Sequence, residues 1–307
     1  MGNTKKMKKI KKTIGVFITL LFLLSGSVTL VSHPALAAVP EQAAPERAVP
    51  ERILSIAPAG TEILFELGLG GRIIGVTRYC TWPPEARTIF NLGGMLHVSI
   101  ETVMGLRPDL VLVSNMNIQI GERLEALGFR VVAVNQDSFE EICASILRVG
   151  RESGVEETAE LRVAELRNLV REKTLPMGAE PPRVLVVVGR DPSENLRRLY
   201  IAGQMAFYND LLTKAGAVNA YGHNVPYAHI TLEGLLRLDP DVIIELVGGH
   251  GTTNPAASAW GEAESGVRAA REGRVFLIEG DFAFRPGPRY PEILGAFIEA
   301  IHGAARE

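Results

Sequence analysis

Short apolar runs alternate with segments of helical periodicity along the first half of the chain. The apolar runs have the length and composition of buried strands, and the segments between them repeat apolar residues every three or four positions. Thr61 is the expected N-cap of the first such segment, and Gly68 closes it. Strands alternating with helices predict a parallel α/β sheet. The expected strands are 52–57, 72–76, 110–113 and 130–134, and the expected helices are 62–67, 100–106 and 120–127.

The chain from Ser138 to Thr174 contains no proline and keeps its apolar residues at helical spacing. This pattern predicts a long helix, with a candidate interruption at Ser153-Gly154. The proline-containing stretch 175–182 ends the helix, and a second α/β run follows. Its expected strands are 183–188, 242–246 and 275–278, and its closing helix is 292–302.

Two segments, one in each half, repeat a single pattern. Residues 100–113 (IETVMGLRPDLVLV) and 232–245 (LEGLLRLDPDVIIE) each predict a short helix, a Pro-Asp turn and a strand. The shared glutamate, leucine and Pro-Asp pair favour an internal repeat over chance similarity. We therefore expect an α/β fold of two lobes of similar construction joined by a helix, with a cleft between them. The expected boundaries are 52–137 for the N-terminal lobe, 138–175 for the connecting helix and 176–307 for the C-terminal lobe.

The N-terminus has the order of features found in secretory signal peptides. Six lysines, from Lys5 to Lys12, precede an apolar run over 13–31 and the small-residue triplet Ala35-Leu36-Ala37. We predict that residues 1–37 are a signal peptide cleaved after Ala37. An uncleaved anchor is the alternative, because the run is just long enough to cross a bilayer. The Ala-, Pro- and Glu-rich stretch 38–51 is expected to be a flexible leader.

Charge and motif content exclude several classes of function. The 307-residue chain carries a formal charge of −3, and loss of the six leader lysines makes it −9, which argues against a nucleic-acid partner. The two cysteines, Cys80 and Cys143, allow either one disulfide or two unpaired thiols. The sequence contains no Gly-x-Ser-x-Gly elbow, P-loop, His-Glu-x-x-His or well-spaced dinucleotide motif, so we do not expect an enzyme.

Three passages resemble the iron-chelate and cobalamin-binding proteins of ABC importers. They are the strand-helix unit 52–68 (RILSIAP, then TEIL and LG), the stretch 75–86 (GVTRYCTWPPEA), and the Leu-x-Pro-Asp unit of each lobe. The resemblance spans Arg52 to about Ala300. It implies a class III solute-binding protein, in which two Rossmann-like lobes joined by a single long helix hold a ligand in the cleft between them. The chelate is then transported cargo, and no resident cofactor is implied.

The resemblance also implies docking onto arginines of the importer permease through one surface carboxylate from each lobe. The matching positions are Glu101 and Glu233, the second residue of each repeated helix. Acids in a first helical turn are favoured by the helix dipole and, at an exposed rim, can pair with arginine. Stabilisation of the two helix starts alone is the alternative.

Candidate ligand contacts come from the vitamin B12-binding branch of the family. Trp82, Tyr200 and Tyr227 match aromatic positions that flank the corrin, and flat macrocycles need such faces. Asp281 and Arg285 match a loop that supplies polar contacts. The sequence departs from this branch at 92–95 (LGGM), where the relative carries a cleft tryptophan, which weakens the case for cobalamin itself.

Two histidines point to an alternative ligand, because His97 and His229 hold equivalent places in the repeat. In facing lobes their imidazoles could approach one ligand from opposite sides, as axial haem ligands or metal donors do, although single loop histidines are more often ordinary surface residues. A ferric siderophore is a further alternative, for which Arg190, Arg285 and Arg289 could supply cationic contacts. Free zinc or manganese ranks below these, because no further cluster of histidines or carboxylates is evident.

The sequence therefore predicts an exported, monomeric solute-binding protein, periplasmic or otherwise extracytoplasmic. We expect it to capture a corrinoid, or else haem or a ferric siderophore, and to deliver this cargo to an ABC importer. A sensory protein that binds the same ligand is the remaining alternative.

Overall fold

The computed structural model describes residues 48–95, 97–190, 196–248, 260–261 and 266–303. The chain from Ala48 onward forms one compact unit. The expected signal peptide, its cleavage site after Ala37 and most of the expected leader lie outside the described residues. Within these ranges, no helix is both long and apolar enough to cross a membrane.

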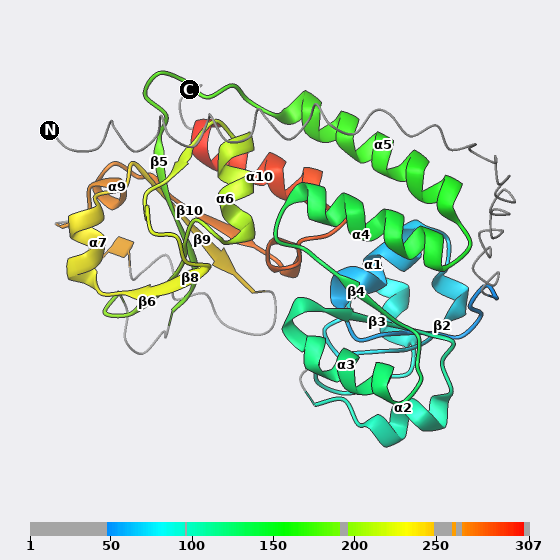
Figure 1. Cartoon of the computed structure of the whole chain (residues 1–307). Coiled ribbons are helices and arrows are strands. Elements are labelled where there is room, and N and C mark those ends of the chain that lie inside the picture. The colour runs from blue at the N-terminus through cyan, green and yellow to red at the C-terminus, as the bar shows by residue number, and fades with distance from the viewer. Residues whose placement is uncertain (1–47, 96, 191–195, 249–259, 262–265, 304–307) are drawn as a thin grey trace, which may run out of the picture. The chain divides into compact units, whose positions relative to one another are not determined.

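A four-stranded parallel sheet builds the first lobe (Figure 1). Its central strands are buried on both faces, so alternate apolar residues of a strand pack on opposite faces of the sheet. Leu110 and Leu112 pack with helices α1 and α4, whereas Val111 and Val113 pack with helices α2 and α3. The strand order is β2 (Ile73–Val76), β1 (Ile53–Ser55), β3 (Leu110–Ser114) and β4 (Val131–Val134), and the helices are α1 (Pro58–Glu66), α2 (Ile100–Leu106), α3 (Ile118–Ala126) and α4 (Phe139–Glu152).

Helix α1 begins earlier than the sequence pattern indicated. Thr61 was the expected N-cap, but the N-cap is Ala57, and Pro58 occupies the first helical turn. Proline is favoured there because its missing N–H is not needed and its φ suits a helix. The Thr61 side chain is buried and donates a hydrogen bond to the Ser55 hydroxyl at 2.8 Å. Thr61 therefore ties the helix to strand β1.

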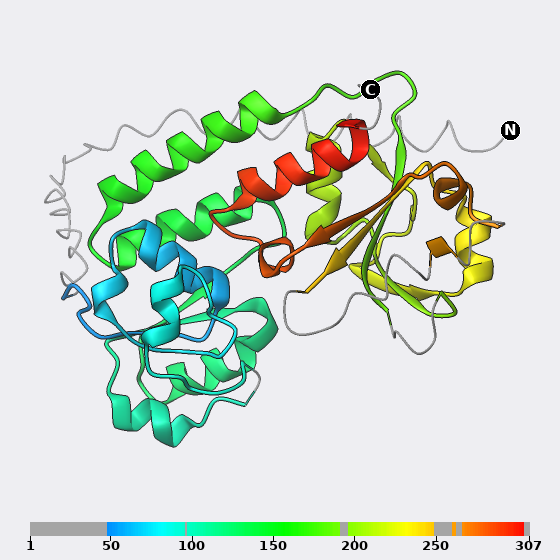
Figure 2. The same cartoon turned by 180° about the vertical axis from the view of Figure 1, so that it is seen from behind.

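Two helices, not one, follow the first sheet. The interruption expected at Ser153-Gly154 is confirmed, because α4 ends at Glu152. Gly154 adopts a left-handed conformation with a φ of 72°, which glycine tolerates at a helix end. Helix α5 (Glu156–Lys173) then runs back along α4 and leads to the second lobe. Figure 2 shows α5 beside the closing helix α10 (Tyr290–His302), with which it is in contact.

The second lobe contains a mixed sheet of six strands. Strands β10, β9 and β5 are parallel, as expected, whereas β6 and β8 are antiparallel additions that the sequence pattern did not predict. Helices α6 and α10 pack on one face, and α7 and α9 on the other. The elements are β5 (Arg183–Arg190), β6 (Leu199–Ala202), α6 (Phe207–Lys214), β7 (Val218–Asn219), β8 (Tyr227–Ile230), α7 (Leu232–Leu238), β9 (Val242–Val247), α9 (Arg268–Arg271) and β10 (Val275–Glu279). Single 3₁₀ turns complete the described chain: η1 (Gly70–Arg72), η2 (Pro84–Thr88), η3 (Asn115–Asn117) and η5 (Asp281–Phe284).

The repeated units have matching geometry. Asp109 of the first Pro-Asp pair accepts the backbone N–H of Arg52 at 3.0 Å, and Asp241 of the second accepts that of Arg183 at 2.8 Å. The guanidinium groups of these two arginines donate to carbonyls at the ends of α2 and α7. Although burial opposes it, the N–H of Arg183 and the guanidinium of Arg268 lower the pKa of Asp241. Each Pro-Asp turn thus pins a helix end to the start of a neighbouring strand.

The lobes share one buried apolar core. A single cluster contains residues from both sheets together with α4, α5, α6 and α10. At its centre the rings of Phe139 and Tyr290 lie 4.8 Å apart, and the Tyr290 hydroxyl donates to Asp210 at 2.7 Å. Contiguous packing of this kind resists relative movement of the packed parts.

The two cysteines are unpaired. Cys80 lies in the loop after β2 and Cys143 in α4, and both are buried free thiols. Burial raises the pKa of Cys143 to about 11 and also raises that of Cys80. The structure therefore has two unpaired thiols and not a disulfide. Buried thiols with raised pKa values are poor nucleophiles near neutral pH.

Candidate ligand-binding cleft

A cavity of 810 Å³ lies between the lobes. Its lining follows the carboxyl ends of parallel strands, where open α/β sheets generally bind ligands. Segments after β1, β2, β3 and β4 contribute from the first lobe, and segments after β9 and β10 from the second. The lining residues are Pro58, Ala59, Arg78, Tyr79, Met95, Ser114, Met116, Gln136, Gly248, Asp281, Phe284 and Arg285.

A second cavity of 410 Å³ adjoins the first and extends along the second lobe. Ser114, Met116, Gln136 and Phe284 line both cavities. The rest of its wall is rich in aromatic rings, and Asp137 is its charged member. The aromatic residues found only here are Tyr200, Phe207, Tyr208 and Tyr227.

The tyrosine pair of the second cavity is positioned by the antiparallel strands. Tyr200 on β6 lies opposite His229 of β8, and Tyr227 lies opposite Ala202. The two tyrosine rings are 5.3 Å apart and inclined by 30°. Burial raises the pKa of Tyr227, and the charges of Tyr200 and Asp137 add to this effect, so the phenol is neutral at physiological pH.

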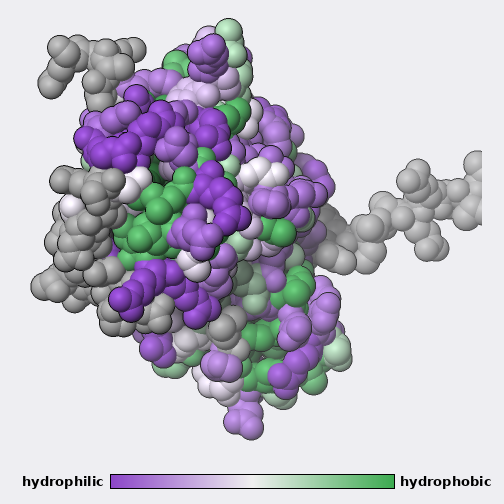
Figure 3. Space-filling view, turned by 90° about the vertical axis from the view of Figure 1, so that its left-hand side faces the viewer, coloured by the Kyte–Doolittle hydropathy of each residue, from purple (hydrophilic) through white to green (hydrophobic). Residues whose placement is uncertain are grey.

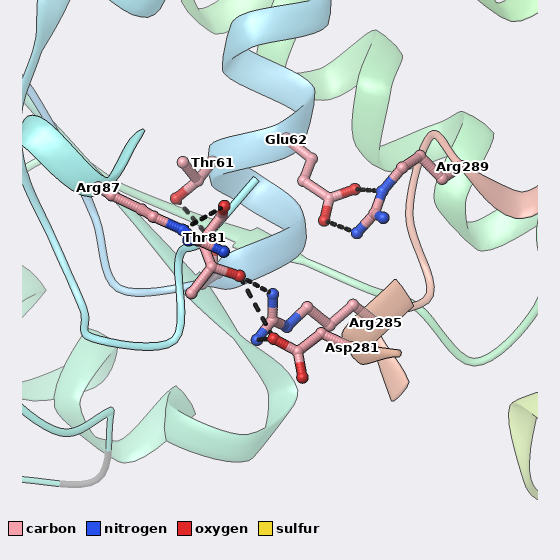
Figure 4. A network of polar contacts seen from close by, with 8 residues as sticks. Thr61, Glu62, Thr81, Arg87, Asp281, Arg285 and Arg289 are labelled. Carbon is pink, nitrogen blue, oxygen red and sulfur yellow. Dashed lines mark hydrogen bonds and ion pairs between the residues drawn. The ribbon is translucent and has the colours of Figure 1, made fainter. Parts of the chain in front are cut away.

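A short segment of the second lobe, Arg285–Arg289, reaches across to the first lobe. Arg285 donates to the hydroxyl of Thr81, and its other terminal nitrogen lies 2.9 Å from Asp281 (Figure 4). Gly287 is needed because a Cβ there would come within 3.3 Å of Ala59. We call Arg285–Arg289 the cross-lobe segment.

The cross-lobe segment ends in a buried ion pair. Arg289 donates two hydrogen bonds to Glu62 of α1, at 2.9 and 2.6 Å, and both side chains are nearly inaccessible (Figure 4). Burial raises the pKa of Glu62 more than Arg289 lowers it. The Arg289 guanidinium also lies 4.9 Å from the centre of the Trp82 ring, within the range of a cation–π contact.

The structure brings four of the expected ligand residues to the cleft. Asp281 and Arg285 line the larger cavity, and Tyr200 and Tyr227 line the smaller one. Trp82 lines neither cavity. It is 43% exposed, with Arg289 over its ring.

The matched histidines do not line either cavity. His97 is exposed directly before α2, and His229 is exposed on β8 with its ring 4.9 Å from that of Tyr200. Elsewhere in the described ranges, no group of three or more histidine, cysteine or carboxylate side chains is arranged to hold a metal ion.

All three arginines suggested for a siderophore form ion pairs, Arg285 with Asp281 of its own loop. Arg190 is buried at the end of β5, where its Nε donates to Glu245 at 2.7 Å, and Trp260 donates to the same carboxylate at 2.6 Å. Arg289 is held by Glu62. Only Arg285 of the three lines the larger cavity.

Both expected docking carboxylates lie on exposed helix starts. Glu101 follows the N-cap Ser99 of α2, and Glu233 follows the N-cap Thr231 of α7. Glu233 forms an exposed ion pair with Arg237 one turn later. Figure 3 faces the end of the second lobe where α7 lies, and apolar surface is exposed there beside hydrophilic surface.

Sequence reasoning missed several cleft residues. Tyr79, Met116 and Phe284 all line the larger cavity. A usable signal existed for Tyr79, because it stands three residues after the end of a predicted strand, at the sheet edge where ligands bind. Arg78 beside it was likewise not singled out.

The fold and the cleft define a two-lobed binding protein whose ligand sits between α/β lobes. Comparison with known proteins agrees: the periplasmic binding protein family matches residues 53–281, and the chain belongs to this family.

The relatives include a vitamin B12-binding protein and a haem-binding protein. The chain is 30% identical over 260 residues to the ABC transporter substrate-binding lipoprotein YvrC of Bacillus subtilis, covering 81% of this chain and 79% of that one. It is 25% identical to the vitamin B12-binding protein of Vibrio cholerae, over 77% of this chain and 84% of that one. A periplasmic haem-binding protein of Pseudomonas aeruginosa superimposes with a TM-score of 0.70 at 25% identity, covering 83% and 94% of the two chains. These relatives indicate a substrate-binding protein of an ABC transporter of the B12, haem or iron-chelate type.

Proposed function

We propose that this protein captures a corrinoid, or a related flat metal chelate, between its lobes and delivers it to the permease of an ABC importer. The observation that carries the proposal is the 810 Å³ cavity bounded by both lobes at the strand ends. Its volume is within the range of about 300–1,000 Å³ typical of small-molecule sites. The adjoining 410 Å³ cavity offers room for the substituents of a large ring.

Aromatic rings and thioethers would hold the faces of such a ligand. Tyr79 and Met116 support this role from the first lobe, and Tyr200 and Tyr227 support it from the second. Asp281 and Arg285 would serve polar substituents of the ring, as would the backbone around them. Trp82 lines neither cavity and is in contact with Arg289, so we assign it a supporting role beside these contacts.

Haem is the second candidate, because a haem-binding structure and a vitamin B12-binding relative are each 25% identical to the chain. In that case His97 and His229 are the proposed axial donors, although both would have to turn into the cleft from their exposed positions. The family and these relatives are binding proteins, and we propose that the chain performs no catalysis.

Docking to the permease is assigned to Glu101 and Glu233. Their support is the matched geometry of α2 and α7, which presents one exposed carboxylate from each lobe. Arginines of a partner can pair with such groups. Export is part of the same proposal, with the mature chain beginning after Ala37. The periplasmic and lipoprotein relatives support an extracytoplasmic location.

Titration of the mature protein with cyanocobalamin, haemin and a ferric siderophore tests the function. We expect the corrinoid to bind with an affinity of about −8 to −12 kcal/mol, that is, micromolar to nanomolar. Tyr200→Ala and Tyr227→Ala should each weaken binding by about 1–3 kcal/mol through lost burial and stacking. Phe90→Ala is the matched control, because this ring is 55% exposed and lines neither cavity. Binding of free zinc or manganese with no chelate bound would contradict the proposal.

A further inference from the structure

Arg78 is the charged cleft residue that forms no ion pair with any of the described residues. It lies two residues after the end of β2, and its backbone N–H donates to the carbonyl of Gly93 at 2.9 Å, which fixes the start of this loop. The side chain is exposed and lines the larger cavity. Across the described part of the chain, no carboxylate lies within ion-pair distance of its guanidinium.

The other charges of the larger cavity balance each other. Arg285 and Asp281 are paired at 2.9 Å, and Thr81 accepts a further hydrogen bond from Arg285. Among the described lining residues, this pair leaves Arg78 as the one remaining charged side chain of the larger cavity. The smaller cavity has the opposite sign, because Asp137 is its charged lining residue and only the neutral Asn115 side chain donates to it, at 3.2 Å. The fixed charge is therefore unequal along the cleft.

We propose that Arg78 recognises an anionic group on the ligand, so that the cargo is a flat metal chelate with a phosphodiester or carboxylate arm. This inference rests on the proposed function and names the substrate class of the same site. A guanidinium presents parallel N–H donors that match both phosphate and carboxylate oxygens, and a half-enclosed cleft strengthens their attraction relative to water. The neighbouring Tyr79 ring is 46% exposed and lines the same cavity, so it can contact the chelate itself.

Two pairs of probes separate the anionic arm from the ring. Cyanocobalamin carries a phosphodiester that dicyanocobinamide lacks, and haemin carries two carboxylates that its dimethyl ester lacks. Each probe is titrated into the wild-type protein, Arg78→Gln, Arg78→Lys and the control Arg123→Gln. Arg123 is an exposed arginine of α3 outside both cavities, so its replacement changes the net charge equally.

We expect Arg78→Gln to weaken binding of the anionic member of one pair by about 10–100-fold, the range for a lost hydrogen bond to a charged group. Binding of the probe that lacks the anionic arm should change less than about 2-fold. The affinity of Arg78→Lys for the anionic probe should lie between those of the wild type and Arg78→Gln, and Arg123→Gln should match the wild type. The pair of probes that responds shows whether Arg78 recognises a phosphodiester or a carboxylate. Circular dichroism of each variant confirms that it is folded.

Three results would overturn the inference while leaving the proposed function intact: undiminished binding of every chelate to Arg78→Gln, an equal loss for both members of a pair, or an equal loss in Arg123→Gln. If none of the four probes binds the wild-type protein, the proposed function fails and the inference fails with it.

Discussion

The buried ion pair between Glu62 and Arg289 allows a quantitative test of how the lobes are held together. The side chains are 3% and 11% exposed, and the two residues lie 227 positions apart in the chain. Replacing Arg289 by methionine leaves a buried carboxylate without its cation. Removal of one partner from such a pair costs about 3–5 kcal/mol. Loss of the cation–π contact with Trp82 adds about 0.5–1 kcal/mol, so we expect Arg289→Met to lower the free energy of unfolding by about 3–6 kcal/mol.

The pH dependence of this loss has a definite sign. Because burial raises the pKa of Glu62, the folded state binds this proton more tightly than the unfolded state does. Glu62 therefore contributes stability below its ordinary pKa, and this contribution is lost as pH rises through the raised pKa of the folded state. Removing Arg289 takes away the charge that lowers this pKa, so the pKa rises further. The cost of Arg289→Met should be larger at about pH 8 than at about pH 5.

Urea unfolding followed by circular dichroism at both pH values measures the cost. The control is Arg237→Met, which breaks the exposed Glu233–Arg237 pair and should cost less than about 1 kcal/mol. The double variant Glu62→Leu with Arg289→Met should recover much of the loss, because neither charge remains buried. A cost for Arg289→Met below about 1 kcal/mol, or one that grows on acidification, would refute the reasoning.

Three further predictions follow from the proposed function. Replacing Glu101 and Glu233 together by alanine should abolish transport by the importer yet leave ligand affinity within about 2-fold, and lost ligand binding would show that they are misplaced. Alanine at His97 or His229 should leave cobalamin binding unchanged. If haem is the cargo, each replacement should alter a low-spin spectrum, and an unaltered spectrum would remove the bis-histidine ligation. The intact mass of the exported protein should correspond to a chain that begins at Ala38, whereas a retained leader would contradict cleavage.

Local sequence patterns were sufficient where a single element determines its own structure. The expected helix 100–106 has the bounds of α2, and the strand expected at 110–113 differs from β3 by one residue. Both Pro-Asp turns were found because Asp109 and Asp241 accept hydrogen bonds from backbone N–H groups at fixed positions. Such a contact needs an aspartate at the same place in each turn, so it leaves a signal in the sequence.

Pairing between distant segments was not visible in the same patterns. Strands β6 and β8 are only four residues long, so neither has enough positions to show a clear period in the sequence. They form by antiparallel pairing, β6 with β5 and β8 with β6. Thr61 was misassigned for a related reason: its hydroxyl donates to Ser55 and to the Ala57 carbonyl, and it does not cap a helix N–H. Cap preferences are local, whereas this contact is tertiary.

The sequence by itself determined the alternation of strands and helices, the repeat, and hence two lobes with a cleft between them, because side-chain periodicity is set by backbone geometry within each element. Only the tertiary structure decided which charged residues face the cleft. Arg190 and Arg289 are consumed by Glu245 and Glu62, whereas Arg78 is left to line the cavity. An arginine's role depends on whether a carboxylate from a remote part of the chain arrives beside it, and that is settled by packing of the lobes and not by the local sequence.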